Sequence, residues 1–96
     1  PFKNPKNQQQ KSINALFDIQ NISKVLNEGW IPDFNNKNEY KYYPYFIKNS
    51  SGWVVYSDCY WSAYSYGGFG IYFKSSTLAL YCGNQFLKIY SDYLPE

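Results

Sequence analysis

Two segments of the chain, one near each end, repeat apolar residues at the spacing of an amphipathic helix. The first helix is predicted to run from an N-cap at Ser12 to about Asn27, and Gly29 is the expected left-handed residue beyond its end. Ile13 and Phe17 fall on nearly the opposite side, so we expect them to pack under the preceding residues or to contact a partner or an upstream segment. The apolar face itself consists of Ala15, Ile19, Ile22 and Leu26.

The second helix is predicted to begin after a cap at Ser75 or Ser76 and to end before Pro95. Gly83 borders its apolar stripe and would allow a close approach of this helix to a sheet. The stripe consists of Leu78, Ala79, Cys82, Phe86, Ile89, Tyr90 and Tyr93. A separate line, expected to be solvent-exposed or an interface, consists of Leu80, Leu87 and Leu94.

Alternating apolar residues and turn signals predict three strands between the two helices. The first strand covers residues 39–48, and Pro44 makes it an edge strand or places a bulge there, because proline has no N–H. A connection over 49–52 leads into a return strand over 53–58. The third strand is expected over 69–74.

These elements predict an α+β fold in a single domain over residues 11–96. A three-stranded antiparallel meander would pack against two helices in a two-layer α-β-β-β-α arrangement. Residues 1–10 are polar and contain two prolines, which is typical of a flexible arm. Because the chain begins at Pro1 without a Met, we expect processing or further residues upstream.

Aromatic residues fill much of the chain, which has 12 Tyr, 7 Phe and 3 Trp but no His. Without His, the chain lacks the usual proton shuttle at neutral pH and the commonest metal ligand. All nine cationic side chains are scattered lysines, so the net charge of +2 does not form the basic stripe of a duplex-DNA binder. No apolar run is long enough for a membrane span and no signal segment opens the chain, so we expect no membrane association.

The remaining ionisable side chains do not form a catalytic or metal-binding pattern. Cys59 lacks a His base, and we expect Cys59 and Cys82 to be free thiols, although a disulfide between them stays geometrically open. Four acids fall at predicted helix ends or turns, where capping acids are typical: Glu28, Asp33, Glu39 and Asp58. The sequence therefore predicts a non-enzymatic protein with no cofactor, no metal and no small-molecule substrate.

Two binding interpretations remain, and both use aromatic side chains. In the first, an aromatic loop over 59–68 and the leucine line contact a protein partner through Tyr60, Trp61, Tyr64, Tyr66, Leu80 and Leu87. In the alternative, single-stranded nucleic acid stacks weakly and without sequence preference on a platform made of Tyr40, Lys41, Tyr42, Lys48, Tyr72 and Lys74. A purely structural role in the core is favoured for Tyr43, Tyr45, Phe69, Ile71 and Phe73.

Three runs of the sequence resemble a family of short uncharacterised proteins of gut anaerobic bacteria and their phages and prophages. The runs are NEGWIPDF over 27–34, KYYPYF over 41–46, and FKSSTLALY with its following helix over 73–93. The resemblance implies a phage- or prophage-type origin, in the cytoplasm of a bacterial host cell or associated with a virion, and no defined activity. We therefore expect a small protein that acts through protein–protein contact, either by self-association or by binding a host or virion protein.

Overall fold

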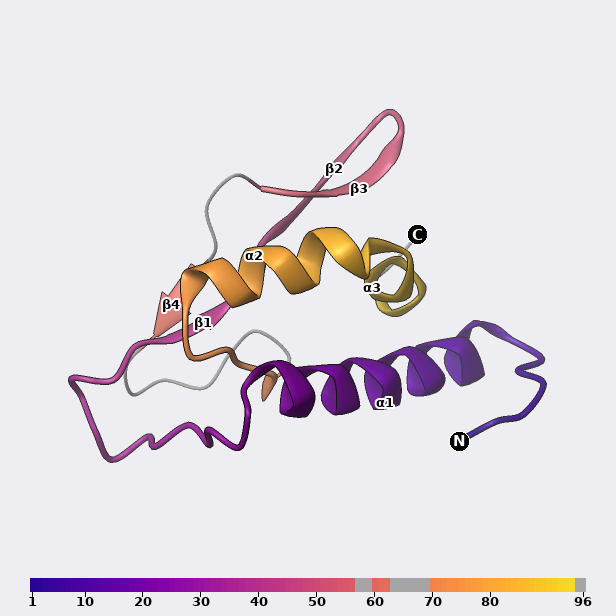
Figure 1. Ribbon diagram of the computed structural model, residues 1–96. Helices are drawn as coiled ribbons and strands as arrows, with labels where there is room; N and C mark the ends of the chain where they lie inside the picture. The colour runs from indigo at the N-terminus through magenta and orange to yellow at the C-terminus, as the bar shows by residue number, and fades with distance from the viewer. Residues whose placement is uncertain (57–59, 63–69, 95–96) are drawn as a thin grey trace.

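The computed structural model of the chain describes residues 1–56, 60–62 and 70–94, with the backbone alone for 60–62 (Figure 1). Its helices pack against its strands, so the predicted α+β class is confirmed. The elements in chain order are α1 (Gln8–Leu26), β1 (Lys41–Tyr43), β2 (Phe46–Asn49), β3 (Gly52–Val55), β4 (Tyr60–Ser62), α2 (Ser76–Gln85) and α3 (Leu87–Tyr93).

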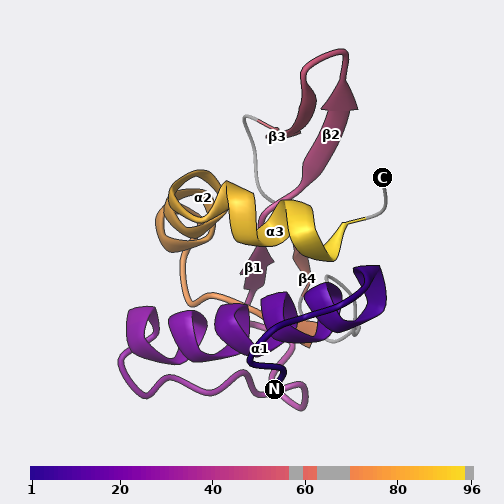
Figure 2. The ribbon, with the colours of Figure 1, turned by 90° about the vertical axis from the view of Figure 1, so that its right-hand side faces the viewer.

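The helices α2 and α3 lie between α1 on one side and the β2–β3 hairpin on the other, and this order is the same in both views (Figures 1 and 2). The described strands form two antiparallel pairs, β1 with β4 and β2 with β3. The described strands therefore do not form the single three-stranded meander expected from the sequence. The hairpin projects from the helices, and β1 and β4 form a separate short ribbon.

The α1 helix begins earlier than predicted because Asn7, and not Ser12, caps it. The side chain of Asn7 accepts a hydrogen bond from the backbone N–H of Gln10 at 2.9 Å, which satisfies one of the free donors of the first turn. Ser12 instead donates through its hydroxyl to the backbone oxygen of Asp92, near the end of α3, at 3.2 Å. The segment predicted as an arm thus contains the start of α1. Farther upstream, Phe2 exchanges two 2.7 Å hydrogen bonds with the Asn14 side chain.

The strand predicted over 39–48 is divided at Pro44, so β1 and β2 enter different sheets. Proline has no N–H for a ladder, which explains the break. β1 pairs with β4, which lies in the segment predicted to be a loop. In the described part of the predicted third strand, 70–74, the pairing is one bridge, in which Tyr42 and Phe73 exchange backbone hydrogen bonds of 3.1 and 2.7 Å.

The predicted C-terminal helix is interrupted at Phe86, whose φ of −114° and ψ of 30° lie outside the helical range. Asn84 donates through its side chain to the backbone oxygen of Leu80 at 3.0 Å, and Gly83 and Asn84 are both weak helix formers. After the break, α3 places Leu94 in the core with 7% exposure. The prediction that Leu94 belongs to an exposed or interface line is therefore wrong.

The core lies where α1, α2, α3 and the segment 71–73 meet, and it contains most of the residues predicted for the two helical faces. Its buried members are Ile19, Ile71, Phe73, Ala79, Cys82, Tyr90 and Leu94. Cys82 is a free thiol, and its sulfur lies 3.7 Å from the Tyr90 hydroxyl. Burial raises the pKa of the Cys82 thiol to about 11, and burial next to Cys82 also raises the pKa of Tyr90. Cys59 lies outside the described residues.

Asn27, buried at the C-terminal end of α1, ties that helix to the segment that carries Phe73. Its side-chain N–H donates to the backbone oxygen of Tyr72 at 2.8 Å, and its side-chain oxygen accepts from the N–H of Lys74 at 3.1 Å. The amide side chain thus occupies the place that a neighbouring strand would take. Gly29 has the left-handed φ of 87° that was predicted, and Glu28 before it is also left-handed, with φ of 51°.

Candidate protein-interaction surface

The structure describes only part of the set of residues predicted to contact a protein partner. Tyr64 and Tyr66 lie outside the described residues, and for Tyr60 and Trp61 only the backbone in β4 is described. Leu80 and Leu87 are half-buried, and they lie on different helices because of the break at Phe86. They therefore do not continue one exposed line along a single helix.

The residues predicted for the nucleic-acid alternative do not share one exposed face. Lys41 is fully buried and Tyr72 is only 3% exposed. The Tyr72 ring lies edge-on to the rings of Phe34 and Tyr43, with centroids 5.4 and 5.8 Å apart. A stacking platform requires rings and cations that solvent can reach, so these two members cannot serve in it as placed. Tyr42 is half-buried, and the exposed members are Tyr40, Lys48 and Lys74.

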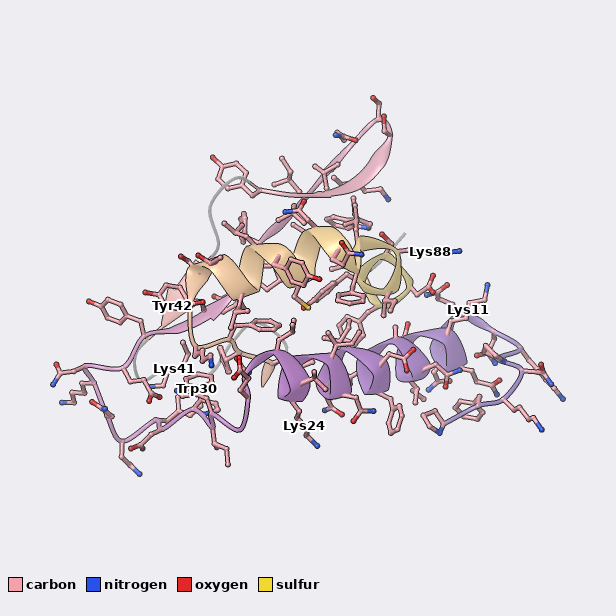
Figure 3. All side chains as sticks on the ribbon, in the orientation of Figure 1. Lys11, Lys24, Trp30, Lys41, Tyr42 and Lys88 are labelled. Atoms are coloured by element: carbon pink, nitrogen blue, oxygen red, sulfur yellow. The ribbon has the colours of Figure 1, made fainter. Side chains whose placement is uncertain are left out.

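Lys41 has a structural environment that the sequence pattern did not indicate. Its ammonium donates to the backbone oxygens of Asn36 at 3.1 Å and of Glu39 at 2.8 Å. It also lies 3.5 Å from Glu39 Oε1 and 5.1 Å from the centroid of the Phe34 ring. A buried charge requires such partners. By contrast, Lys24 and Lys88 extend away from their helices (Figure 3).

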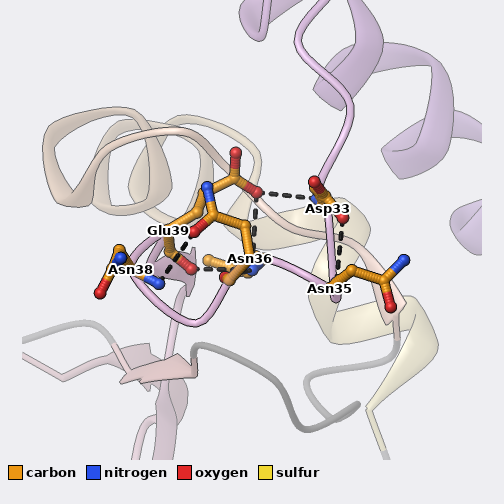
Figure 4. A network of polar contacts seen from close by, with 6 residues as sticks. Asp33, Asn35, Asn36, Asn38 and Glu39 are labelled. Carbon is orange, nitrogen blue, oxygen red and sulfur yellow. Dashed lines mark hydrogen bonds and ion pairs between the residues drawn. The ribbon is translucent and has the colours of Figure 1, made fainter.

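The loop around this buried lysine is held by its own polar side chains (Figure 4). Glu39 Oε1 accepts from the N–H of Asp33 at 2.7 Å, and the Asp33 carboxylate accepts from the N–H of Asn35 at 2.9 Å. The Asn36 side chain accepts from the N–H of Asn38 at 3.0 Å. These are local turn contacts. They account for Asp33 and Glu39 as turn-forming acids, which is the role expected from the sequence.

Two hollows flank the C-terminal half of α1, and the buried polar side chains that line them, Ser23 and Asn27, already have partners. The first, of about 350 Å³, is lined by residues that include Ser23, Asn27 and Trp30. Asn27 is bonded to the segment 72–74, and the Ser23 hydroxyl donates to the Gln20 backbone oxygen at 2.8 Å. The second, of about 290 Å³, is lined by Asn21, Ile22, Val25, Leu26 and Phe86. Among the described residues, no buried side-chain nitrogen or oxygen lacks a hydrogen-bond partner, so neither hollow contains a buried unpaired polar side chain.

The outward side of the β2–β3 hairpin presents apolar and aromatic side chains to solvent. We call this surface the outer face and define it by Tyr45, Ile47, Val54 and Tyr56. Tyr45, Ile47 and Tyr56 are 42%, 40% and 46% exposed. The Tyr45 and Tyr56 rings lie edge to face with centroids 5.9 Å apart. The backbone N–H of Tyr56 donates to the backbone oxygen of Tyr45 at 2.7 Å. The cross-strand contact therefore continues past the ends of β2 and β3.

The opposite side of the hairpin packs on the helices, because side chains alternate between the two sides of a strand. The Phe46 ring lies 4.7 Å from that of Tyr90, centroid to centroid, and Trp53 packs against the core. Val55 lies against Gly83 of α2. The ammonium of Lys48 lies 5.6 Å from the centroid of the Trp53 ring. The helices thus cover this inner face, and the outer face points the other way.

The sequence favoured a core role for Tyr45, and the structure contradicts it. The alternation in KYYPYFIK placed Tyr45 and Ile47 on one side and Phe46 on the other, but both sides carry aromatics. The pairing of Lys48 with Trp53 and the small Gly83 opposite Val55 decide which side faces the helices. Those are tertiary contacts, which the strand pattern alone does not contain.

No helix in the described ranges has both the length and the apolar composition needed to cross a membrane. Among the same residues, no three side chains of the His, Cys, Asp and Glu types gather into a group that could hold a metal ion. Comparison of the chain with protein-family models, with curated proteins and with solved structures finds no match.

Proposed function

We propose that this protein is non-enzymatic and acts through protein–protein contact, with the outer face of the β2–β3 hairpin at the centre of the contact surface. The observation that supports the proposal is the exposure of paired Tyr45 and Tyr56 beside Ile47 on a hairpin whose other side is already covered by helices. Tyrosine offers a large contact area with few rotatable bonds, and it is enriched at interface hot spots.

The outer face is too small to form a complete interface by itself. A specific interface buries about 800 Å² on each partner, which is far more than four side chains supply. Hot-spot residues lie near the centre of an interface and are surrounded by weaker contacts. In our proposal the outer face is that centre. The contact role predicted for Tyr60, Trp61, Tyr64 and Tyr66 stays a prediction.

The class of partner is proposed from the sequence resemblance. The runs over 27–34, 41–46 and 73–93 support a phage- or prophage-type origin, and hence a partner that is a host protein, a virion protein or a second copy of this chain. The site of action would be the cytoplasm of the bacterial host cell or the virion.

A pull-down from lysate of the native host, with and without nuclease, tests the proposal. The bait is compared with a Tyr45→Thr/Tyr56→Thr variant, in which threonine keeps the strand preference while removing both rings. Loss of a hot-spot side chain costs about 2 kcal/mol or more, or roughly 30-fold in affinity, so the variant is expected to lose the partner. The matched control is Tyr40→Thr/Tyr81→Ala, which removes two tyrosines of similar exposure elsewhere.

Nuclease-resistant capture by the parent chain and the control, but not by the outer-face variant, is the expected result. Capture that collapses with nuclease would favour the nucleic-acid alternative. Equal capture by all three proteins would show that the contact surface lies elsewhere.

A further inference from the structure

The hairpin is a two-stranded sheet in which each strand has the other as its neighbour among the described strands. β3 makes the more extensive contacts with α2 and α3, so the edge of β2 that faces away from β3 is the more open edge of the hairpin. An edge strand carries a row of backbone N–H and C=O groups that its own sheet does not use.

The register identifies which groups these are. The bond from the N–H of Tyr56 to the oxygen of Tyr45 marks a hydrogen-bonded pair, and such pairs alternate along an antiparallel ladder. Ile47 therefore faces Val54 as the next hydrogen-bonded pair. Phe46 and Lys48, which lie between these positions, direct their backbone N–H and C=O groups away from β3.

The ends of β2 limit the length of this open edge. Pro44 lies two residues before β2 and has no N–H, so it cannot extend the ladder. At the other end the chain turns back through Ser50 and Ser51. An added strand would therefore pair along residues 45–49, and its outward side chains would lie beside Tyr45 and Ile47.

The charge of the edge specifies the segment further. Lys48 is the one charged residue between Tyr45 and Tyr56 in the sequence, and its side chain is exposed. A partner segment with an acidic residue near Lys48 and apolar residues at alternate positions complements both the charge and the apolar outer face.

We propose that the β2 edge binds an extended segment of a partner protein by strand addition, with apolar residues at alternate positions and an acidic residue beside Lys48. This inference rests on the proposed function and deepens it. Backbone hydrogen bonds to Phe46 and Lys48 would supply affinity, and the outer face would select the alternate side chains.

The test uses the full chain and a displayed library of random peptides of about seven residues, a length that spans the edge. Selection is expected to enrich peptides that alternate β-branched or aromatic residues and contain an acid. Hydrogen exchange measured by NMR then follows single amides with the enriched peptide bound. The amides of Phe46 and Lys48 are expected to become protected, whereas those of Ile47 and Asn49 are already protected in the free chain.

Two variants separate the backbone contact from the charge. Lys48→Pro removes the outward N–H at a position where the hairpin itself does not use it, and Lys48→Ala removes only the side-chain charge. The proline variant is expected to lose roughly tenfold or more in peptide affinity, and the alanine variant less. Retained hydrogen-exchange protection of the Ile47 and Asn49 amides in both variants establishes that the hairpin is still formed.

The inference is overturned if no peptide is enriched, if the enriched peptides protect other amides, or if Lys48→Pro binds as well as the parent chain. Protection of the Phe46 and Lys48 amides that rises with protein concentration alone would identify a second copy as the occupant and overturn the assignment to a partner segment. If capture of the partner is lost in Tyr45→Thr/Tyr56→Thr but is unchanged in Lys48→Pro, the proposed function stands and strand addition fails.

Discussion

Gly83 of α2 lies so close to Pro44 that a Cβ atom added to the glycine would be 2.8 Å from the Pro44 Cβ. The same added atom would be 3.1 Å from Cγ2 of Val55. Pro44 is buried and stands at the junction between β1 and β2, and Val55 lies on the inner face of the hairpin. The absence of a side chain at Gly83 therefore sets how the hairpin rests on α2, and through it which face of the hairpin is exposed.

Gly83→Ala tests this contact. Alanine gains up to about 1 kcal/mol in helix propensity over glycine, but overpacking typically costs about 1–3 kcal/mol, and the rigid proline ring cannot move aside easily. We expect a lower free energy of unfolding by urea denaturation. Gln85→Ala, at an exposed position of the same helix, is the control and should change stability little. A Gly83→Ala variant as stable as the parent would contradict the close packing.

Asn27→Ala tests the two hydrogen bonds by which the Asn27 side chain joins α1 to the segment 72–74. It leaves the oxygen of Tyr72 and the N–H of Lys74 without their amide partner, and each unpaired buried group costs about 1–3 kcal/mol. Asn27→Asp keeps an acceptor for the N–H of Lys74 but places its second carboxylate oxygen against the backbone oxygen of Tyr72. We therefore expect it to be no more stable than Asn27→Ala. Thermal unfolding measures both, with the exposed Asn35→Ala as control. Equal melting temperatures for Asn27→Ala and Asn35→Ala would show that these two hydrogen bonds contribute nothing.

Lys41→Met tests the buried ammonium. Methionine keeps the length and apolar stem but removes the ammonium donor from the backbone oxygens of Asn36 and Glu39, which should destabilise the protein by about 1–3 kcal/mol. The Asn36 oxygen keeps a second donor, the N–H of Glu39 at 3.3 Å. Lys37→Met, in the exposed part of the same loop, is expected to be near neutral. Chemical denaturation of the two variants provides the comparison. A stabilising Lys41→Met would mean that desolvation of the charge outweighs its contacts.

The buried Cys82 thiol is expected to make the free energy of unfolding depend on pH in the alkaline range. Its pKa is raised from the ordinary 9.0 to about 11 in the folded protein, because burial disfavours the thiolate. The unfolded chain therefore loses this proton first, and folding stability from this group is complete below pH 9 and falls as the pH rises toward 11. We expect the decline in the free energy of unfolding over this range to be shallower in Cys82→Ala than in the parent. Identical slopes would contradict a buried, protonated thiol.

The helical faces could be predicted because they depend on local spacing. Ala15, Ile19, Ala79 and Cys82 lie in the interior as expected, since an amphipathic helix buries its apolar stripe wherever it packs. The close approach at Gly83 could be predicted for the same reason. The helix break at Phe86 was missed because the stripe continues through it.

The strands were harder to predict, because their pairing depends on distant partners. A strand pattern with aromatics on both sides, such as that around Pro44, does not say which side is covered, so Tyr45 was expected in the core. The pairing of β1 with β4 required the chain to return from a segment rich in turn residues. The sequence predicts that Lys41 is available to a ligand, but the structure buries it. Its burial could not be predicted because it depends on a turn containing Phe34, Asn36 and Glu39, which closes around the ammonium. The outer face follows only once these contacts are known.

Site-specific photo-crosslinking in host cells is the most direct measurement of the proposed contact. A photoreactive phenylalanine derivative replaces Tyr56 on the outer face in one strain and the equally exposed Tyr81 of α2 in another. Our account predicts a discrete protein adduct, resistant to nuclease, from position 56 and not from position 81. An adduct from position 81 alone, or none from position 56, would contradict the assignment of the outer face as the contact surface.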